Sequence, residues 1–396
     1  MSFENPESII RSLNLQAGFS NARVSEDRLV PDKYSRVRQP FTRSFREHQL
    51  PSQVDWNVTY SWFLPESLRV VSSIFVEIQL PALGTGNYKE CPGLYAIEQQ
   101  RFLSAGTESY HVNPALFLRE YLCSLTEEAC DQFCKTYLGK TDAPSGGART
   151  IWVPVFLPNS AYFHRHSENH HGFGAFPAYL GGNRLEVQMR FAPAENLTQS
   201  GADNAGPVSG NVKMIVHQIE APPDAIMKYS DVRGQYSIVG RRLTEITNGW
   251  TTAQANVAET ITQVQPLGTV TSLLILAVPT GTADAKKEIL QTTGTRSIKI
   301  TADSVVQRDL ESAQKCRVEL WSNGFTGNNY CNTASRMCFN AHGSDDKIYS
   351  GGYQMSLSSQ INVDVSFPAA VDYRVYAVQY QRVTINSTGH VQSSLE

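Results

Sequence analysis

Charged residues are scarce in this chain. They make up 18% of its 396 residues, whereas about 25% is usual for soluble domains. The formal net charge of −3 argues against a dedicated nucleic-acid binder, because such a protein is normally strongly basic. A low charge fraction fits a protein that hides much of its surface against copies of itself, and it also fits many all-β proteins.

Long apolar runs and disulfide patterns are missing as well. No apolar run approaches the roughly 20 residues that a membrane-spanning helix needs. Residues 1–16 lack the basic region and apolar core of a secretory signal, so none is expected. The chain has seven cysteines and no C-x-x-C pair. Because that number is odd and the chain is long, we expect reduced, mostly buried thiols and no disulfide scaffold.

Apolar and aromatic residues, at 41% and 10% of the chain, are numerous enough for a core, and the length suits two domains. Many short segments rich in β-branched and aromatic residues are bounded by proline or glycine, which predicts strands. In Ile361–Phe367 apolar and polar residues alternate, as in a strand with one buried face. The predicted strands are Val54–Leu64, Leu68–Leu80, Leu94–Phe102, Thr107–Val112, Ile151–Leu157, Arg184–Phe191, Val212–Ile219, Thr269–Val278, Ser297–Thr301, Tyr353–Ser358, Ile361–Phe367 and Tyr373–Ile385.

One region, Asn113–Gly139, has a clear helical pattern. Ser124 and Glu127 form a capping-box pattern that predicts the start of a second helix, and Gly139 suits the position just after its end. Three cysteines fall on one face of this region: Cys123, Cys130 and Cys134. That spacing favours core packing over metal binding.

The first 50 residues have the pattern of an arm outside any barrel. Its basic residues are Lys33, Arg36, Arg38, Arg43 and Arg46, with aromatic residues between them. Such a segment could contact nucleic acid or lipid head groups. The charge density is modest, which favours an extended arm that packs on a neighbouring subunit.

Many short strands without alternating helices favour sandwiches or barrels over a βαβ fold. No short repeat is visible, which argues against propellers and solenoids. Two β-rich halves of similar length suggest duplicated barrels. We therefore predict an N-terminal arm over 1–50, a first barrel over 51–220, and a second barrel with a C-terminal tail over 221–396.

The order of several segments resembles the double-jelly-roll major capsid proteins, a lineage that includes adenoviruses, large nucleocytoplasmic DNA viruses and tailless phages with an internal membrane. The helical region sits where these proteins carry an insertion. The chain is too short to contain long tower loops, and in size it is nearer to the phage proteins. Ile261–Val278 resembles a strand pair that turns at Gly268. The other segments that carry the resemblance are Phe75–Leu83 (FVEIQLPAL), Gly93–Phe102, Trp152–Pro158 (WVPVFLP), Phe176–Val187 (FPAYLGGNRLEV), Ser297–Asp309, Tyr349–Phe367 and Tyr376–Tyr380 (YAVQY).

This resemblance implies an all-β fold of two tandem eight-stranded jelly rolls, with an N-terminal arm and a short helical insertion in the first barrel. It implies a major capsid protein of a tailless icosahedral virus, which trimerises into pseudo-hexagonal capsomers and is assembled in the host cell into the virion. The implied partners are neighbouring capsomers, penton and minor capsid proteins and an internal membrane, without sequence-specific nucleic acid. No enzymatic activity, catalytic residue or cofactor is expected.

A histidine cluster raises a metal hypothesis, because imidazole is a common ligand of transition metals. The candidate ligands are His164, His166, His170 and His171. Cupins are jelly-roll metalloproteins, and their motif needs a glycine well before H-x-H. Pro158 holds that position here, and Glu168 follows His166 too closely. We therefore predict no metal site, but a polar loop at a subunit contact or capsid surface that could respond to pH near about 6.

A carbohydrate-binding or carbohydrate-cleaving jelly roll is the alternative function. Glycosidase carboxylates have no fixed spacing in sequence, so their pattern neither supports nor excludes it. Tryptophans could stack on sugars, although core or interface positions are commoner for them. The tryptophans are Trp56, Trp62, Trp152, Trp250 and Trp321. This alternative predicts a cleft lined by paired carboxylates or by exposed tryptophan and tyrosine.

Overall fold

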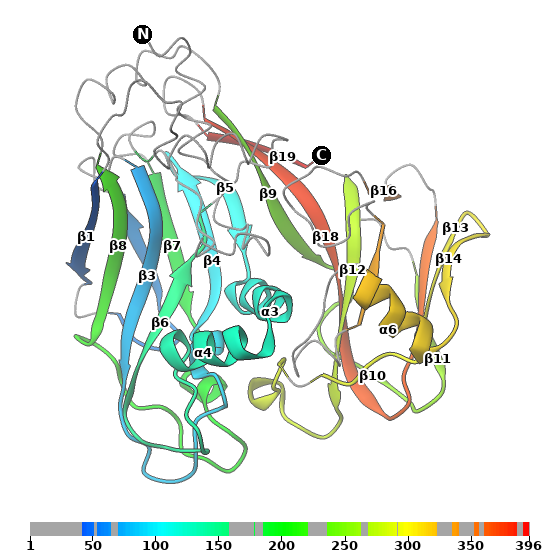
Figure 1. Cartoon of the computed structure of the whole chain (residues 1–396), viewed down its shortest axis with the longest axis horizontal. Helices are drawn as coiled ribbons and strands as arrows, with labels where there is room; N and C mark the ends of the chain where they lie inside the picture. Colours follow the sequence, from blue (N-terminus) through cyan, green and yellow to red (C-terminus); the bar gives the residue numbers. More distant parts are fainter. Residues whose placement is uncertain are drawn as a thin grey trace.

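Four antiparallel β-sheets form the molecule in a computed structural model, and they pack in pairs as two barrels that stand side by side (Figure 1). The structure describes residues 42–50, 54–64, 70–157, 178, 185–220, 236–262, 268–290, 292–322, 335–339, 352–355, 360–385 and 391–395.

The first barrel contains eight strands. They are β1 (Thr42–Gln49), β2 (Thr59–Phe63), β3 (Val70–Leu80), β4 (Ile97–Ser104), β5 (Thr107–Val112), β6 (Arg149–Val155), β7 (Leu185–Phe191) and β8 (Val212–Glu220). One sheet, which we name sheet I, has the order β1-β8-β3-β6, and the other, sheet II, has the order β2-β7-β4-β5. This crossing of strands between two facing four-stranded sheets is the jelly-roll topology.

The second barrel repeats this topology. Its strands are β9 (Tyr236–Glu245), β10 (Thr251–Ala253), β11 (Ala258–Ile261), β12 (Thr269–Pro279), β13 (Ser297–Ala302), β14 (Val305–Leu310), β15 (Ser335–Cys338), β16 (Tyr353–Gln354), β17 (Ile361–Ser366), β18 (Val371–Ile385) and β19 (Val391–Leu395). Its sheet I runs β10-β18-β12-β15, with β9 and β19 also paired to β18 and β16 to β12, and its sheet II runs β11-β17-β13-β14. With β9 and β10 as one broken first strand and β15 and β16 as one broken sixth strand, both barrels have the same strand order.

Alternating burial shapes the strands of both barrels. In β17 the side chains of Ile361, Val363 and Val365 are buried while those between them are half-buried, and β7 alternates in the same way. The buried set of β17 belongs to the core of the second barrel. The predicted all-β double jelly roll is therefore confirmed, and so is the one-face-in interpretation of Ile361–Phe367.

Two helices connect β5 to β6, as the sequence predicts. They are α3 (Pro114–Ser124) and α4 (Glu127–Tyr137). The capping box predicted at Ser124 is wrong, because Ser124 ends α3 and the Thr126 hydroxyl caps α4 by accepting the Ala129 N–H at 3.4 Å. Gly139 does follow the end of α4, with φ of +76°. None of the described helices is long and apolar enough to cross a membrane.

A further helix, α6 (Ala313–Ser322), connects β14 to β15. It occupies the same place in the second barrel that α3 and α4 occupy in the first. The predicted insertion in the first barrel is confirmed, whereas α6 was not predicted. Only Cys316, Glu319 and Leu320 of this helix are buried. So short a buried stripe, with a glutamate in it, gives a weak helical pattern in the sequence. The 3₁₀ turns are η1 (Pro92–Tyr95), η3 (Ala194–Leu197) and η4 (Asp284–Lys286).

Two other expectations from the sequence need correction. Residues 42–49, predicted to belong to the arm, form β1 and pair with β8 along their whole length. As an edge strand, β1 carries polar and exposed side chains, so its sequence lacks the apolar pattern that predicts a strand. The strands on either side of Gly268 do not pair with each other, because β11 pairs with β17 in sheet II and β12 with β18 in sheet I.

Replacing Gly139 with alanine should destabilise the protein more than replacing Gly201. Both glycines have positive φ, which costs an alanine about 1 kcal/mol. A Cβ at Gly139 would also lie 2.7 Å from Cγ2 of Ile151, whereas one at Gly201 meets nothing within 4 Å. We expect Gly139→Ala to lose at least about 1 kcal/mol more of the free energy of unfolding than the control. Denaturant titration measures both, and equal losses would contradict the packing argument.

Candidate functional site at the barrel junction

Sheet I of the second barrel is buried on both faces. Every residue of β12 from Thr269 to Val278 is buried. Leu273 and Ile275 point into the core of the second barrel, whereas Leu274 and Leu276 belong to the apolar cluster of the first. On β18 the side chains split in the same way, with Val375 and Ala377 on the inner face and Tyr376 and Val378 on the outer face. One sheet is thus shared by two cores.

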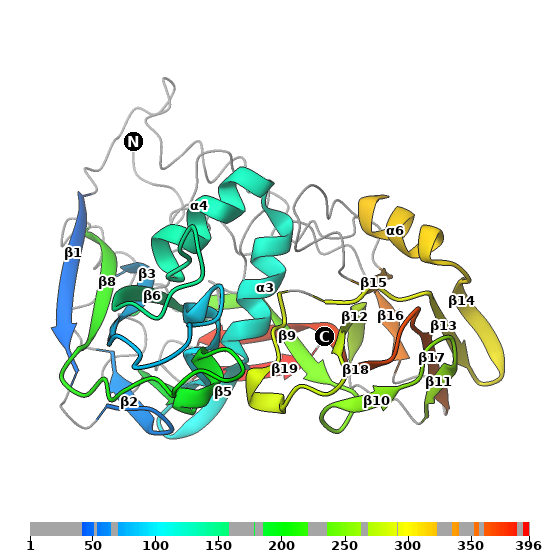
Figure 2. The ribbon, with the colours of Figure 1, turned by 90° about the horizontal axis from the view of Figure 1, so that it is seen from below.

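Helix α3 fills the space between the barrels, as the two views show (Figures 1 and 2). It is buried at Leu116, Phe117, Leu118, Arg119 and Glu120, and so on every side. The chain therefore buries an arginine completely and a glutamate almost completely. Buried charges are retained only when they are paired and hydrogen-bonded.

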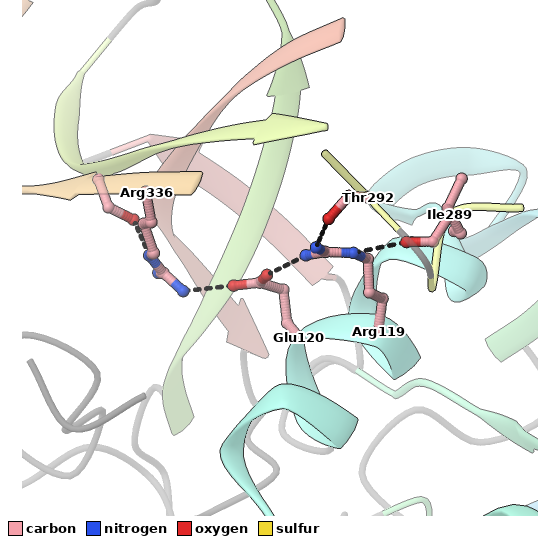
Figure 3. Close-up of polar contacts among 6 residues, drawn as sticks. Arg119, Glu120, Ile289, Thr292 and Arg336 are labelled. Carbon is pink, nitrogen blue, oxygen red and sulfur yellow. Dashed lines mark hydrogen bonds and ion pairs between the residues drawn. The ribbon is translucent and has the colours of Figure 1, made fainter. Parts of the chain in front are cut away.

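Arg119 donates across the junction to the second barrel (Figure 3). Its Nε donates to the backbone oxygen of Ile289 at 2.8 Å, and a terminal nitrogen donates to Oγ1 of Thr292 at 3.2 Å. Its other terminal nitrogen lies 3.4 Å from Oε1 of Glu120. All three nitrogens of this fully buried guanidinium are thus partnered.

Glu120 bridges Arg119 to a second buried arginine. Its Oε2 accepts from Arg336 of β15, whose own Nε donates to Oγ of Ser272 on β12 at 2.9 Å. The result is a positive-negative-positive triad that begins in the first barrel and ends in sheet I of the second (Figure 3). Such triads fix geometry strictly, because charge-assisted hydrogen bonds are directional and removal of one member leaves an unpaired charge.

Residues 283–290, which we name the junction loop, lie between β12 and β13. Side chains of the first barrel form hydrogen bonds with this loop. Nζ of the buried Lys89 donates to the backbone oxygens of Ala285 at 2.9 Å and Lys287 at 3.0 Å. The same nitrogen lies 4.0 Å from the ring centre of Tyr95. The Tyr95 hydroxyl accepts the N–H of Ile289 at 3.0 Å. Side chains of the first barrel therefore hold the backbone of the loop in place through specific hydrogen bonds.

Neighbouring lysines of the loop attach it on both sides. Nζ of Lys286 donates to the backbone oxygen of Glu195 at 2.9 Å in the first barrel. Lys287 instead pairs with Asp372 of β18 at 3.1 Å and lies over the ring of Trp250. The loop is thus fixed to both barrels by consecutive residues.

The long strand β18 makes a further connection away from the loop. Beyond Gln379 it leaves β12 and pairs with β9 and β19, and this ribbon runs toward the first barrel (Figure 1). Nε2 of Gln381 donates to the backbone oxygen of Ser109 on β5 at 3.1 Å, and Val383 joins the apolar cluster of the first barrel. The barrels therefore touch along much of their length.

Burial governs the acid–base behaviour of this junction. It lowers the pKa of Lys89 to about 7, although nearby Glu288 opposes the shift. It raises the pKa of Glu288 and holds the pKa of Tyr95 well above its usual value. Both shifts favour the neutral form, of the Lys89 amine and of the Glu288 carboxyl. This is expected in a contact that excludes water and whose polar atoms mainly bind backbone groups.

An open groove of 1610 Å³ lies at one end of the junction. Lys140 crosses its wall and pairs with Glu90 at 2.8 Å and Asp131 at 3.1 Å. Hydrogen bonds from Lys135 and Lys140 lower the pKa of the Asp131 carboxyl. Among the described residues of its lining, Tyr88 is the aromatic one and no tryptophan occurs. Lysines thus hold Glu90 and Asp131, whereas burial raises the pKa of Glu288 in the same lining.

The structure does not bring the predicted interaction residues together. His164, His166, His170, His171, Lys33, Arg36 and Arg38 lie outside the described residues. Arg43 and Arg46 lie on β1, Trp62 is buried, Trp321 is exposed, and Trp56, Trp152 and Trp250 are half-buried. The six cysteines among the described residues are buried and free. Within the same residues no cluster of three or more histidine, cysteine or acidic side chains could hold a metal.

Sequence reasoning missed the residues of the junction. The one available signal was the pair Arg119–Glu120 within an otherwise apolar helical stretch, ALFLREYL. Lys89 and Arg336 gave no signal, because their partners lie 196 and 216 residues away along the chain.

These sheets and their junction define a double jelly roll. Similar structures are the PBCV-1 virus capsid (TM-score 0.66, 12% identity, 92% of this chain and 98% of that one), the Faustovirus major capsid protein (0.64, 11%, 95% and 96%) and the mavirus major capsid protein (0.55, 13%, 91% and 92%). No protein-family model and no curated protein matches the sequence. At such low identity the likeness establishes the fold, along almost the whole length of each chain.

Glu120→Gln should weaken the junction strongly. The substitution removes the negative charge between two buried guanidinium groups, which typically costs about 3–5 kcal/mol. Glu108→Gln is the matched control, because Glu108 is 42% exposed and pairs with the similarly exposed Arg101, where about 1 kcal/mol or less is expected. Denaturant unfolding measures both variants. A loss for Glu120→Gln no larger than for the control would contradict the structural role of the triad.

The stability of the junction should increase with pH above neutrality. The folded pKa of Lys89 is about 7, below its ordinary value of 10.5, so between these values the unfolded chain binds more protons and alkali favours folding. The wild type should therefore gain stability relative to Lys89→Met, by up to about 1.4 kcal/mol per pH unit between about pH 7.5 and about pH 9.5. Parallel stability curves for the two proteins would refute this assignment.

Proposed function

We propose that this chain is the major capsid protein of a tailless icosahedral virus, and that three copies form a pseudo-hexagonal capsomer. The observation that carries the proposal is the buried junction, which fixes two jelly rolls of identical topology side by side in one polypeptide. Support comes from the likeness to the PBCV-1 capsid and to the Faustovirus and mavirus major capsid proteins.

The geometry explains why two barrels suit this task. Two similar barrels fill two neighbouring corners of a hexagon, so a threefold rotation completes all six. The tile keeps its outline only if the angle between the barrels is constant. The shared sheet, the charged triad and the hydrogen-bonded junction loop supply that rigidity. Domains joined by a small polar interface, by contrast, usually move relative to each other.

The remaining assignments follow from the same proposal. The segment before β1 serves as an arm that packs on a neighbouring subunit through Lys33, Arg36 and Arg38, the jelly rolls span 42–220 and 236–395, and the histidine segment is a polar contact loop. The protein acts in the virion shell as a structural component without cofactor or catalytic residue. Its partners are neighbouring capsomers, penton and minor capsid proteins, and an internal membrane beneath the shell.

The structural likeness favours this function over the carbohydrate-binding or carbohydrate-cleaving alternative. The groove at the junction also argues against that alternative, because among the described residues its lining has no tryptophan and has Tyr88 as its one aromatic residue.

The purified chain should sediment as a trimer. Three copies of 43.9 kDa give about 132 kDa, and negative-stain class averages should show a six-lobed outline with threefold symmetry. Analytical ultracentrifugation and imaging of one sample provide both measurements. A stable monomer, or a trimer without paired lobes, would overturn the proposal, and release of sugar from a glycan by the monomer would favour the alternative.

A further inference from the structure

The two barrels face the same way along the chain. In both views sheet I of the second barrel faces the first barrel, while sheet I of the first barrel faces away from the second (Figures 1 and 2). The junction is therefore a head-to-tail contact between the sheet II side of one barrel and sheet I of the next. Two faces take no part in the junction: a free head, which is sheet I of the first barrel and is covered in part by α4, and a free tail, which is the sheet II side of the second barrel.

The second barrel carries an exposed counterpart of α3, which is helix α6. It packs between β15 of sheet I and β14 of sheet II, at the edge next to the free tail. Both α3 and α6 follow the fifth strand of their barrel, but α3 is buried in the junction whereas Val318 and Trp321 on α6 are 60% and 74% exposed. They are three residues apart and so lie on one side of the helix. The opposite side is held firmly, because Glu319 accepts from Arg308 of β14 at 2.6 Å and from the N–H of Cys338 at 3.1 Å.

The free head is an aromatic surface on the outer face of sheet I in the first barrel. Phe45 of β1 is 48% exposed, and its ring lies 5.2 Å from that of His217. Further along the sheet, Phe75 lies 6.0 Å from His217, but it is buried and its ring stacks on Tyr137 of α4 at 5.4 Å. The exposed part of this face therefore lies around Phe45. In the second barrel the same face of sheet I is apolar and is covered by the junction.

We propose that α6 of one copy packs on this aromatic surface of the next copy, in the way that α3 packs on sheet I within the chain. Val318 and Trp321 contact the surface around Phe45. The contact joins different faces, so it closes into a ring after three copies if the rotation at each contact is a third of a turn. This inference rests on the proposed trimer and names the surfaces that hold it together.

Charge placed on either surface should prevent assembly. Trp321→Glu and Phe45→Glu should each sediment at the monomer mass of 43.9 kDa with an unchanged circular dichroism spectrum. Val318→Glu provides a second test of the α6 surface. Val257→Glu is the control, because Val257 is also exposed, at 45%, but lies between β10 and β11 outside both surfaces, and it should remain trimeric.

A mixing experiment tests the head-to-tail geometry itself. The Phe45→Glu chain keeps its α6 surface and the Trp321→Glu chain keeps its aromatic surface, so an equal mixture should form one intact contact and no ring. Native mass spectrometry should then show a one-to-one heterodimer of about 88 kDa, twice the chain mass of 43.9 kDa. Homodimers of either variant alone would instead indicate a symmetric contact and overturn the inference.

The outcomes separate this inference from the proposed function. If the wild type is trimeric and both charged variants stay trimeric, the capsomer stands and the assigned surfaces are wrong. If the wild type itself is not trimeric, the capsomer and these surfaces are both refuted.

Discussion

Strand β12 contributes alternate side chains to two different cores, and the rest of the molecule depends on this arrangement. A sheet with one polar face would leave the second barrel free to stand alone. Here the outer face of the sheet is apolar and must be shielded from water as much as the inner face. Its residues are Leu274, Leu276, Tyr376 and Val378. Since apolar burial is the main favourable contribution to folding, the first barrel is that cover and the pair behaves as one body.

Apolar contact alone would not fix one angle between the barrels, because it is not directional. The direction comes from polar groups that have a single satisfactory arrangement. Arg119 must reach the backbone oxygen of Ile289, Arg336 must reach Ser272, and Glu120 must lie between the two arginines. A slide of one barrel over the other would leave these groups buried and unpaired, a cost of several kcal/mol (about 3–5) in other proteins.

Local patterns allowed much of the fold to be predicted, whereas the site depended on distant contacts. The alternation in Ile361–Phe367 and the glycine after α4 report on neighbouring residues, so both were correct. Strand β1 was taken for an arm because its sequence is mostly polar, and α6 was missed because it buries few residues. Lys89 gave no signal in the sequence, because its backbone acceptors in the junction loop lie 196 and 198 residues away along the chain.

The late position of β18, after the other strands of both barrels except β19, has a consequence for synthesis. The shared sheet has this strand at its centre, so neither barrel can finish its packing until β18 has left the ribosome. A prematurely terminated polypeptide would retain an open apolar wall and would be recognised by chaperones and proteases. Synthesis of β18 thereby becomes a condition for completing the junction, and products truncated before it lack the centre of the shared sheet.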